Sequence, residues 1–367
     1  MKATKSDYLG PLRLPFLIIN FSCVAAGAGT ALWRKGSISW TDAVLALVGA
    51  VCVHGAVNAL NEYSDSRTGI DARTVRTPFS GGSGTLQRHP EMSGYVLGLG
   101  LLCAAVTAAI GLYFTWTQGW GIVPLGVAGL AIAVFYTPWL TRTSLPCLVA
   151  PGLGFGTCMV MGADFVLGGG YSLAGFAASM APFFLVSNLL LLNQFPDLEA
   201  DRAGGRGHFI TRHGIHAGAV IYALFSAGAY LSVVIAVAAR ILPPLSLLAL
   251  LTTPLAVRAS MVALRDGTDQ TKLAPALGMN VIVNIVTPLL LAVGLMLSRL
   301  DSFCPVASLN LESFCDLRHR PAKRCESCYL LLRLVLSHLS QIPCGWGVHL
   351  MVDRLGAAAF VEFMRLQ

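Results

Sequence analysis

The sequence predicts an all-α, polytopic membrane protein with about nine transmembrane helices. Of its 367 residues, 55% are hydrophobic and only 12% are charged, whereas soluble domains carry about 25% charged residues. Apolar stretches of roughly 17 to 25 residues, the length that crosses a hydrocarbon core of about 30 Å, recur along residues 1–300. The composition therefore excludes an ordinary soluble globular protein.

Nine apolar segments are expected to span the membrane, at 14–33, 42–62, 94–116, 120–138, 145–167, 173–193, 216–239, 242–257 and 275–298. The eighth contains Pro243, Pro244 and Pro254, and prolines kink or end helices unless neighbours satisfy the freed backbone groups. A protein with eight spans is therefore an alternative. No cleavable signal peptide is expected, because the first apolar run is long enough to span and no small-residue cleavage site follows a short core.

Basic residues predict which side of the membrane each loop occupies. With nine spans and a cytoplasmic N-terminus, the segments assigned inside hold most of the Lys and Arg residues before residue 300, among them Arg67 and Arg142. The short loops assigned outside hold Arg34, Lys35 and Arg240. This asymmetry supports the orientation by the positive-inside rule. Together with anionic lipid headgroups it accounts for most of the net charge of +7, so no nucleic-acid partner is expected.

Half of the acidic residues before residue 301 fall in two windows at predicted cytoplasmic helix ends: Glu62, Asp65 and Asp71, then Asp197, Glu199 and Asp201. Carboxylates that continue out of an apolar helix are costly unless they bind cations or line a wet cavity. Both windows are therefore candidate functional sites. A solvated loop is the alternative for either window alone.

The first window continues a polar helical face. His54, Asn58, Asn61 and Asp65 are spaced four, three and four residues apart, so they share one face of a helix. A glycine after them permits a turn that brings Asp71 back toward the others. Carboxylates and amides of this kind supply the oxygen ligands that Mg²⁺ prefers. For His54 and Asn58, hydrogen bonding between helices is the favoured role.

A possible anion site follows directly in the sequence. Arg73 and Arg76 precede a glycine-rich turn at 81–84. Guanidinium groups and exposed backbone amides both bind anions, and diphosphate is the anion that a neighbouring Mg²⁺ site suggests. The alternative is a flexible loop whose arginines only set the topology.

The second window repeats the arrangement. Asn193, Asp197 and Asp201 follow at four-residue steps and so share a helical face. The two carboxylates would repel each other by a few tenths of a kcal/mol in an empty helix, and a bound dication reverses that sign. Arg202 and Arg206 follow within reach of an anion beyond the metal. Two such motifs on one side of the membrane describe one diphosphate held between two metal-binding carboxylate groups.

The two motifs resemble those of the UbiA superfamily of intramembrane prenyltransferases, over about residues 10–300. The family's Asn-x3-Asp with a second Asp is similar to Asn61, Asp65 and Asp71, and its Asp-x3-Asp preceded by Asn is similar to Asn193, Asp197 and Asp201. The six-residue step from Asp65 to Asp71 is more similar to the dihydroxynaphthoate (menaquinone) branch than to the hydroxybenzoate branch, where the step is usually four. Arg13 resembles a recurring arginine of the family.

The resemblance implies nine helices around a central, lipid-accessible cavity capped by Asp-rich cytoplasmic loops. It implies transfer of a prenyl chain from a prenyl diphosphate to an aromatic acceptor, in menaquinone-type quinone biosynthesis, with Mg²⁺ as the cofactor. The alternative acceptors are 4-hydroxybenzoate, a chlorin or a lipid. The protein is expected among the lipids of the cell membrane, with its active site facing the cytoplasm.

The expected roles divide the site residues into two groups. The catalytic group, which also holds the metal, comprises Asp65, Asp71, Asp197 and Asp201. The substrate-binding group comprises Asn61, Arg73, Arg76, Asn193, Arg202, Arg206 and Arg13. Three aromatic side chains, Tyr63, Phe79 and Tyr136, could stabilise an allylic cation through their π faces, although packing is the favoured role.

The chain departs from the family pattern in two places. Gly205-Arg206-Gly207-His208-Phe209 stands where the family usually has Gly-Lys-Arg-Thr-Leu. Ser144-Leu145-Pro146-Cys147 stands where the menaquinone branch often has Gly-Leu-Gly-Glu. The missing Glu bears on the acceptor more than on the diphosphate chemistry.

Two other membrane classes are weighed against this interpretation. A CDP-alcohol phosphotransferase needs one compact Asp-rich signature, and no segment supplies it. A transporter carries charged residues near the membrane midplane, whereas the acids here lie at helix ends, with Asp164 expected near the outer interface.

Residues 301–367 are expected to form an extension to the prenyltransferase domain at 1–300. The extension holds five cysteines, but only Cys325 and Cys328 have tight metal-ligand spacing, and no second pair completes a zinc site. It is expected to be dispensable for catalysis.

Overall fold

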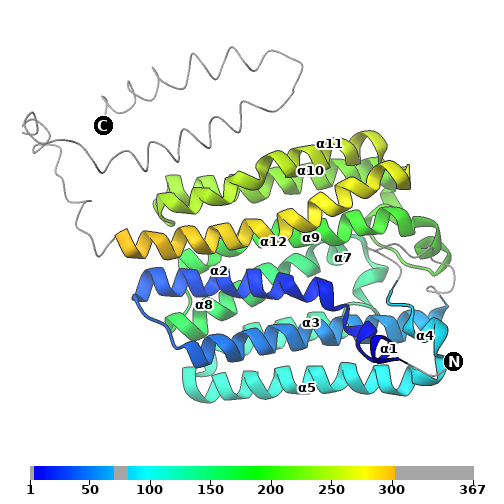
Figure 1. Ribbon diagram of the computed structural model, residues 1–367, viewed down its shortest axis with the longest axis horizontal. Coiled ribbons are helices and arrows are strands. Elements are labelled where there is room, and N and C mark those ends of the chain that lie inside the picture. The colour runs from blue at the N-terminus through cyan, green and yellow to red at the C-terminus, as the bar shows by residue number, and fades with distance from the viewer. Residues whose placement is uncertain (1–3, 70–81, 302–367) are drawn as a thin grey trace, which may run out of the picture. The chain divides into compact units, whose positions relative to one another are not determined.

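A computed structural model describes residues 4–69 and 82–301 of the chain. Throughout these ranges every regular element is a helix, and the long helices lie side by side in one bundle (Figure 1). The predicted all-α class is confirmed. The predictions for Asp71, Arg73, Arg76 and residues 302–367 lie outside the described residues, and the domain boundary at residue 300 stays a prediction.

Within the described ranges, eight helical segments are long and apolar enough to cross a membrane. This makes the chain a multi-pass membrane protein. The segments are Leu14–Lys35, which contains α2 (Ile18–Lys35); α3 (Trp40–Thr68); Pro90–Gln118, which contains α5 (Ser93–Gln118); Ser144–Gly168; α9 (Leu173–Ala203); α10 (Phe209–Ala238); Pro244–Asp266; and Gln270–Arg299 within α12 (Gln270–Asp301).

Two of these segments are irregular. Ser144–Gly168 consists of α7 (Ser144–Gly152), a π-helical stretch at Leu153–Val160 and α8 (Met161–Gly168). Pro244–Asp266, which contains Pro244 and Pro254 and directly follows Pro243, begins as a 3₁₀ helix over Pro244–Thr252 and continues as α11 (Thr253–Asp266). A proline ring removes a backbone donor, and here the tighter 3₁₀ turn follows Pro243 and Pro244 without ending the span.

The predicted segment at 120–138 forms a shorter helix. A 3₁₀ turn at Trp120–Ile122 leads into α6 (Val123–Phe135). At about 1.5 Å per residue the helix is roughly 24 Å long, yet it joins both ends of the bundle. At one end the Tyr171 hydroxyl donates to the Gly121 carbonyl (2.7 Å), and just beyond the other end Asn61 Nδ2 donates to Thr137 Oγ1 (3.2 Å). The described chain therefore has eight candidate spans and one shorter apolar helix that runs between the two ends of the bundle.

The helix α9 lies at the centre of the packing. It contacts α2, α7, the π-helical stretch, α10 and α12. Its small residues, including Ala174, Ala178 and Ala181, are buried. Lipid tails are as apolar as side chains, so the hydrophobic effect does not drive such helices together. Close packing of small residues stabilises their association instead. The second Asp motif therefore extends from the most enclosed helix of the bundle.

Glycines allow the π-helical stretch to lie directly against α9. A Cβ placed on Gly156 would lie 2.4 Å from the Phe183 backbone nitrogen and 2.5 Å from its Cα. Gly156→Ala is therefore expected to destabilise the protein by about 1–3 kcal/mol, the cost of overpacking. Thermal unfolding of purified protein in detergent measures this.

The matched control is Gly162→Ala on the same span, where an added Cβ meets nothing within 4 Å. It should unfold within about 0.5 kcal/mol of the unsubstituted protein. Equal stability of the two variants would contradict the close contact at Gly156.

A buried ion pair closes the end of the bundle away from the Asp motifs. Arg34, at the end of α2, donates to both carboxylate oxygens of Asp164 on α8 (3.0 and 3.2 Å). Ser172, the N-cap of α9, donates to Asp164 Oδ2 (2.5 Å). Asp164 lies at the helix end where it is expected but is buried rather than solvated. It ties three helices together, which is a structural use of the charge.

Candidate active site

The ends of α3 and α9 are joined through one arginine. Arg206, in the loop after α9, places Nη2 2.5 Å from Asp65 Oδ2 and Nη1 2.8 Å from Asp201 Oδ1. Asp65 is on α3 and 5% exposed, and Asp201 is on α9 and 1% exposed. The two motifs, 136 residues apart from Asp65 to Asp201, therefore meet in space at one end of the bundle.

The cluster of Asp65, Asp201 and Arg206 has one more carboxylate than guanidinium. Burial lowers the pKa of Arg206, but the charges of Asp65 and Asp201 outweigh it and hold that pKa above its ordinary value. Arg206 is therefore a permanent cation at this position. One negative charge of the two carboxylates is left uncompensated by Arg206. This charge favours the binding of a further positive ion at the cluster.

His208 fixes Asp201 from the other side. It is buried and is the N-cap of α10, where Nδ1 accepts from the Thr211 backbone N–H (3.4 Å). Its proton consequently lies on Nε2, which is 2.8 Å from Asp201 Oδ2 and donates to it. Sequence comparison flagged this position only as a departure from the family pattern. Its contact with Asp201 depends on a chain reversal that spacing does not show.

The other predicted residues of the second motif fall into two groups, those buried along α9 and one that is exposed. Asn193 lies two helical turns before Asp201, and its Oδ1 is buried without a hydrogen-bond partner in the described part of the chain. Asp197 lies between them on α9, with a buried Oδ1. Arg202 is exposed and donates to Glu199 (3.1 Å). The structure does not bring Arg202 to the cluster.

Glu62, from the first acidic window, bonds to the segment after the first loop and not to the cluster. It is 1% exposed and accepts from Ser83 N (3.1 Å), Ser83 Oγ (2.5 Å) and Thr85 N (3.1 Å). Its charge is thus used to hold the segment that follows the first loop. The sequence placed it in an acidic window taken as a candidate functional site, because backbone donors leave no mark in a residue pattern.

A small pocket with several polar groups lies between α2, α3 and α9, further along the two helices that carry the cluster. Its volume is about 70 Å³, and its lining includes Arg13, His54, Asn58, Phe155 and Asn193. Arg13 Nε and His54 Nδ1 are buried without hydrogen-bond partners among the described residues, as is Asn193 Oδ1. Three unpaired polar atoms in a closed space fit a small polar ligand.

The neighbours of this pocket are held by hydrogen bonds to the N-terminal segment. Arg13 Nη2 lies 3.4 Å from Asn61 Oδ1, and Asn58 Nδ2 donates to the Leu12 carbonyl (3.0 Å). The hydrogen-bonding role expected of Asn58 is confirmed. His54 instead presents its ring edge-on to Phe155, with 4.7 Å between ring centroids.

A larger apolar cavity of about 440 Å³ runs between α3, α5, α6 and the π-helical stretch. Its lining extends from Phe114 and Ile122 to Tyr136, and it shares His54, Phe155 and Leu190 with the small pocket. Tyr136 lies close enough to Arg206 and Asp201 to interact electrostatically with both. The cavity therefore extends from the carboxylate cluster toward the opposite end of the bundle, as an extended apolar chain would require. Tyr63, by contrast, packs against Leu86 and Met92.

The donors at the cluster suit Mg²⁺. Asp65 and Asp201 offer carboxylates, which are the hard oxygen ligands that this ion takes. Within 4–69 and 82–301, no group of three or more His, Cys, Asp and Glu side chains is arranged to hold a metal alone.

Comparison with known proteins gives related sequences. A protein of Mycobacterium leprae named 1,4-dihydroxy-2-naphthoate octaprenyltransferase is 30% identical over 275 residues, which cover 69% of this chain and 84% of that protein. A Bacillus subtilis protein of the same name is 29% identical over 187 residues, 49% of this chain and 57% of its own.

Solved structures share the fold. A UbiA homolog from Aeropyrum pernix K1 superposes with a TM-score of 0.59 at 20% identity, over 76% of this chain and 97% of its own. A UbiA homolog from Archaeoglobus fulgidus bound to DMAPP and Mg²⁺ superposes with a TM-score of 0.54 at 15% identity, over 78% and 100%. The model of the UbiA prenyltransferase family matches residues 21–297. This chain therefore belongs to the UbiA prenyltransferase family and is a membrane prenyltransferase.

Proposed function

We propose that this chain uses Mg²⁺ to transfer a prenyl chain from a prenyl diphosphate to 1,4-dihydroxy-2-naphthoate, on the cytoplasmic side of the cell membrane. The observation that carries the proposal is the meeting of Asp65 and Asp201 around Arg206 beside a long apolar cavity. A charged site and an apolar channel side by side match the two ends of a prenyl diphosphate.

The diphosphate end is assigned to the cluster. Asp65 and Asp201, with Asp197 and the predicted ligand Asp71, would hold Mg²⁺, which neutralises charge on the leaving diphosphate. Arg206 is a permanent cation within reach of the same oxygens, and Arg73 and Arg76 are assigned the same role from the sequence. The structural relatives solved with Mg²⁺ and with DMAPP or GPP support this assignment.

The prenyl end is assigned to the apolar cavity. When the allylic carbon–oxygen bond breaks, its electron pair leaves with the diphosphate and an allylic cation remains. An apolar lining excludes the water that would trap this cation. Tyr136, at the end of the cavity near Arg206, is the aromatic side chain best placed to face it. An electron-rich aromatic carbon then forms the new bond and gives up its proton.

The acceptor is assigned to the small pocket. A carboxylated aromatic matches the Arg13 guanidinium, and its hydroxyl groups match the unpaired His54 Nδ1 and Asn193 Oδ1. The names of the M. leprae and B. subtilis relatives favour dihydroxynaphthoate among such acids. Cys147, where the menaquinone branch often has Glu, lies 3.6 Å from both the Tyr136 hydroxyl and Gln194 Nε2.

The cytoplasmic assignment follows from charge. The Asp motifs and the basic loops predicted to lie inside occur at the same helix ends, and lysine and arginine are retained on the cytoplasmic side. Membrane lipids surround the remaining apolar surface.

Diphosphate release by purified protein in detergent tests the proposal. With Mg²⁺, geranylgeranyl diphosphate and dihydroxynaphthoate, release is expected, and EDTA should abolish it because the leaving group then loses its counter-charge. Release with 4-hydroxybenzoate alone would keep the reaction and change the acceptor. Release that ignores EDTA would overturn the metal assignment, and prenyl transfer to neither acid would overturn the acceptor class.

A further inference from the structure

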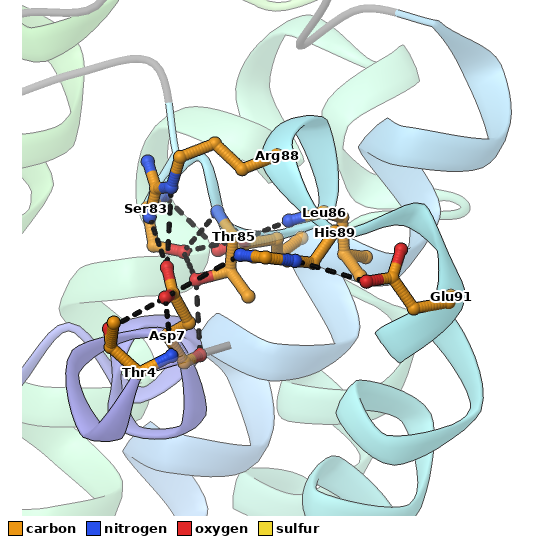
Figure 2. A network of polar contacts seen from close by, with 9 residues as sticks. Thr4, Asp7, Ser83, Thr85, Leu86, Arg88, His89 and Glu91 are labelled. Atoms are coloured by element: carbon orange, nitrogen blue, oxygen red, sulfur yellow. Dashed lines mark hydrogen bonds and ion pairs between the residues drawn. The ribbon is translucent and has the colours of Figure 1, made fainter. Parts of the chain in front are cut away.

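The N-terminal helix α1 (Lys5–Leu9) is fastened to the segment that follows the first loop. Figure 2 shows Asp7 at the centre of this contact. Its carboxylate accepts from Thr4 Oγ1 (2.7 Å), from Arg88 Nη2 (2.8 Å) and from Arg88 Nε (3.2 Å), and His89 Nε2 lies 3.6 Å away. On its outer side His89 meets Glu91 (3.0 Å). Asp7 is itself buried.

The partner segment is in turn fixed to α3. Glu62 holds the backbone at Ser83 and Thr85, and α4 (Thr85–Arg88) begins there. Thr85 Oγ1 donates to the Asp7 carbonyl (3.2 Å). Gly10 allows this approach, because a Cβ there would lie 2.6 Å from Thr85 Oγ1. We call Asp7, Glu62, Thr85, Arg88 and His89 the N-terminal clamp.

Asp7, the clamp residue on α1, lies six residues before Arg13 in the sequence. A 3₁₀ turn at Gly10–Leu12 follows α1, and the Arg13 N–H donates to the Gly10 carbonyl (2.9 Å). Arg13 has φ 50° and ψ 55°, a left-handed conformation that is uncommon for a residue with a side chain. A residue keeps such a conformation only when its surroundings impose it. The clamp at Asp7 and the Asn58 bond to the Leu12 carbonyl, both of which hold the chain just before Arg13, supply that constraint.

We propose that Asp7 is a positioning residue that sets Arg13 in the small pocket, so that acceptor affinity depends on the N-terminal clamp. The proposal rests on the acceptor assignment made above. Asp7 touches neither pocket, and its carboxylate is the point where α1 and the Arg88 side chain meet. Losing that charge frees the helix that precedes Arg13, while the cluster at Asp65 and Asp201 keeps its own contacts.

Steady-state kinetics of the full chain test the proposal through Asp7→Asn. The KM for dihydroxynaphthoate is expected to rise about tenfold, while the KM for geranylgeranyl diphosphate stays within about twofold, because only acceptor binding is weakened. Arg88→Gln should act in the same direction, and the double variant should be little worse than either alone, since both remove one contact. Asp42→Asn, at the opposite end of α3, is the matched control and should leave both KM values unchanged.

A second measurement separates this proposal from the proposed function. Calorimetric binding of dihydroxynaphthoate, without prenyl diphosphate, should be about tenfold weaker for Asp7→Asn than for the unsubstituted protein. If the unsubstituted protein binds the acid but transfers nothing, the proposed function fails and the clamp can still hold. Equal affinities, equal rises in both KM values, or no binding by either protein would overturn the positioning role. Restored affinity in Asp7→Glu would support it.

Discussion

Replacing Asp65 with Asn is expected to lower turnover by about 10²- to 10³-fold, the usual cost of removing one group that stabilises transition-state charge. The side chain keeps its size and can still accept a hydrogen bond from Arg206, so the fold should persist. The lost charge weakens the hold on Mg²⁺ as the diphosphate leaves. Release of diphosphate at saturating Mg²⁺ and substrates measures the effect, and Asp201→Asn should behave in the same way.

The control for this prediction is Glu199→Gln. Glu199 belongs to the same acidic window as Asp201 but is exposed and pairs only at the surface with Arg202. Its turnover should remain close to that of the unsubstituted protein. Near-normal turnover of Asp65→Asn, or an equal loss in Glu199→Gln, would contradict the assignment of the buried carboxylates to the metal.

Arg206→Gln is expected to destabilise the metal-free protein by about 3–5 kcal/mol, because two buried carboxylates then lose their shared cation. Their side chains are 7% and 2% exposed, so water screens little of the repulsion. Mg²⁺ should restore much of the loss by supplying positive charge at the same place. Thermal unfolding in detergent, with EDTA and with Mg²⁺, measures the difference.

Arg212→Gln serves as the comparison. Arg212 is exposed and its guanidinium donates to the Arg142 carbonyl (3.2 Å), so loss of this side-chain contact should change stability by less than about 1 kcal/mol in either condition. The prediction fails if Mg²⁺ leaves the stability of Arg206→Gln unchanged, because the metal and the guanidinium would then occupy different places.

Hydropathy and periodicity predicted the helical class and the positions of the spans, because both follow from local composition. The four-residue steps through Asn61 and Asp65, and through Asn193 and Asp201, predicted which side chains share a helical face. The structure adds the bridge at Arg206, which brings the two faces together. That bridge depends on how the loop after α9 folds back, and sequence spacing carries no such information.

Other features were hidden from the sequence for physical reasons. Glu62 belongs to an acidic window in the sequence, yet its carboxylate accepts from the backbone N–H groups of Ser83 and Thr85. Asp7 stands outside every motif, and its partners follow 81 and 82 residues later at Arg88 and His89. Contacts of this kind depend on tertiary folding. The roles of Asp71, Arg73 and Arg76 stay predictions from the sequence.

The short helix α6 has a consequence for the surrounding bilayer. With its preceding 3₁₀ turn it runs from Trp120 to Phe135, and at roughly 24 Å it falls about 6 Å short of a typical hydrocarbon thickness, which is a hydrophobic mismatch. Trp116, near the end of α5, and Trp120, at the start of the turn into α6, are exposed. Trp139, just after α6, is exposed as well. Tryptophan prefers the headgroup level of the membrane. Local thinning of the bilayer beside this helix would accommodate its length, whereas the neighbouring α5, with 26 residues, is long enough to span without it.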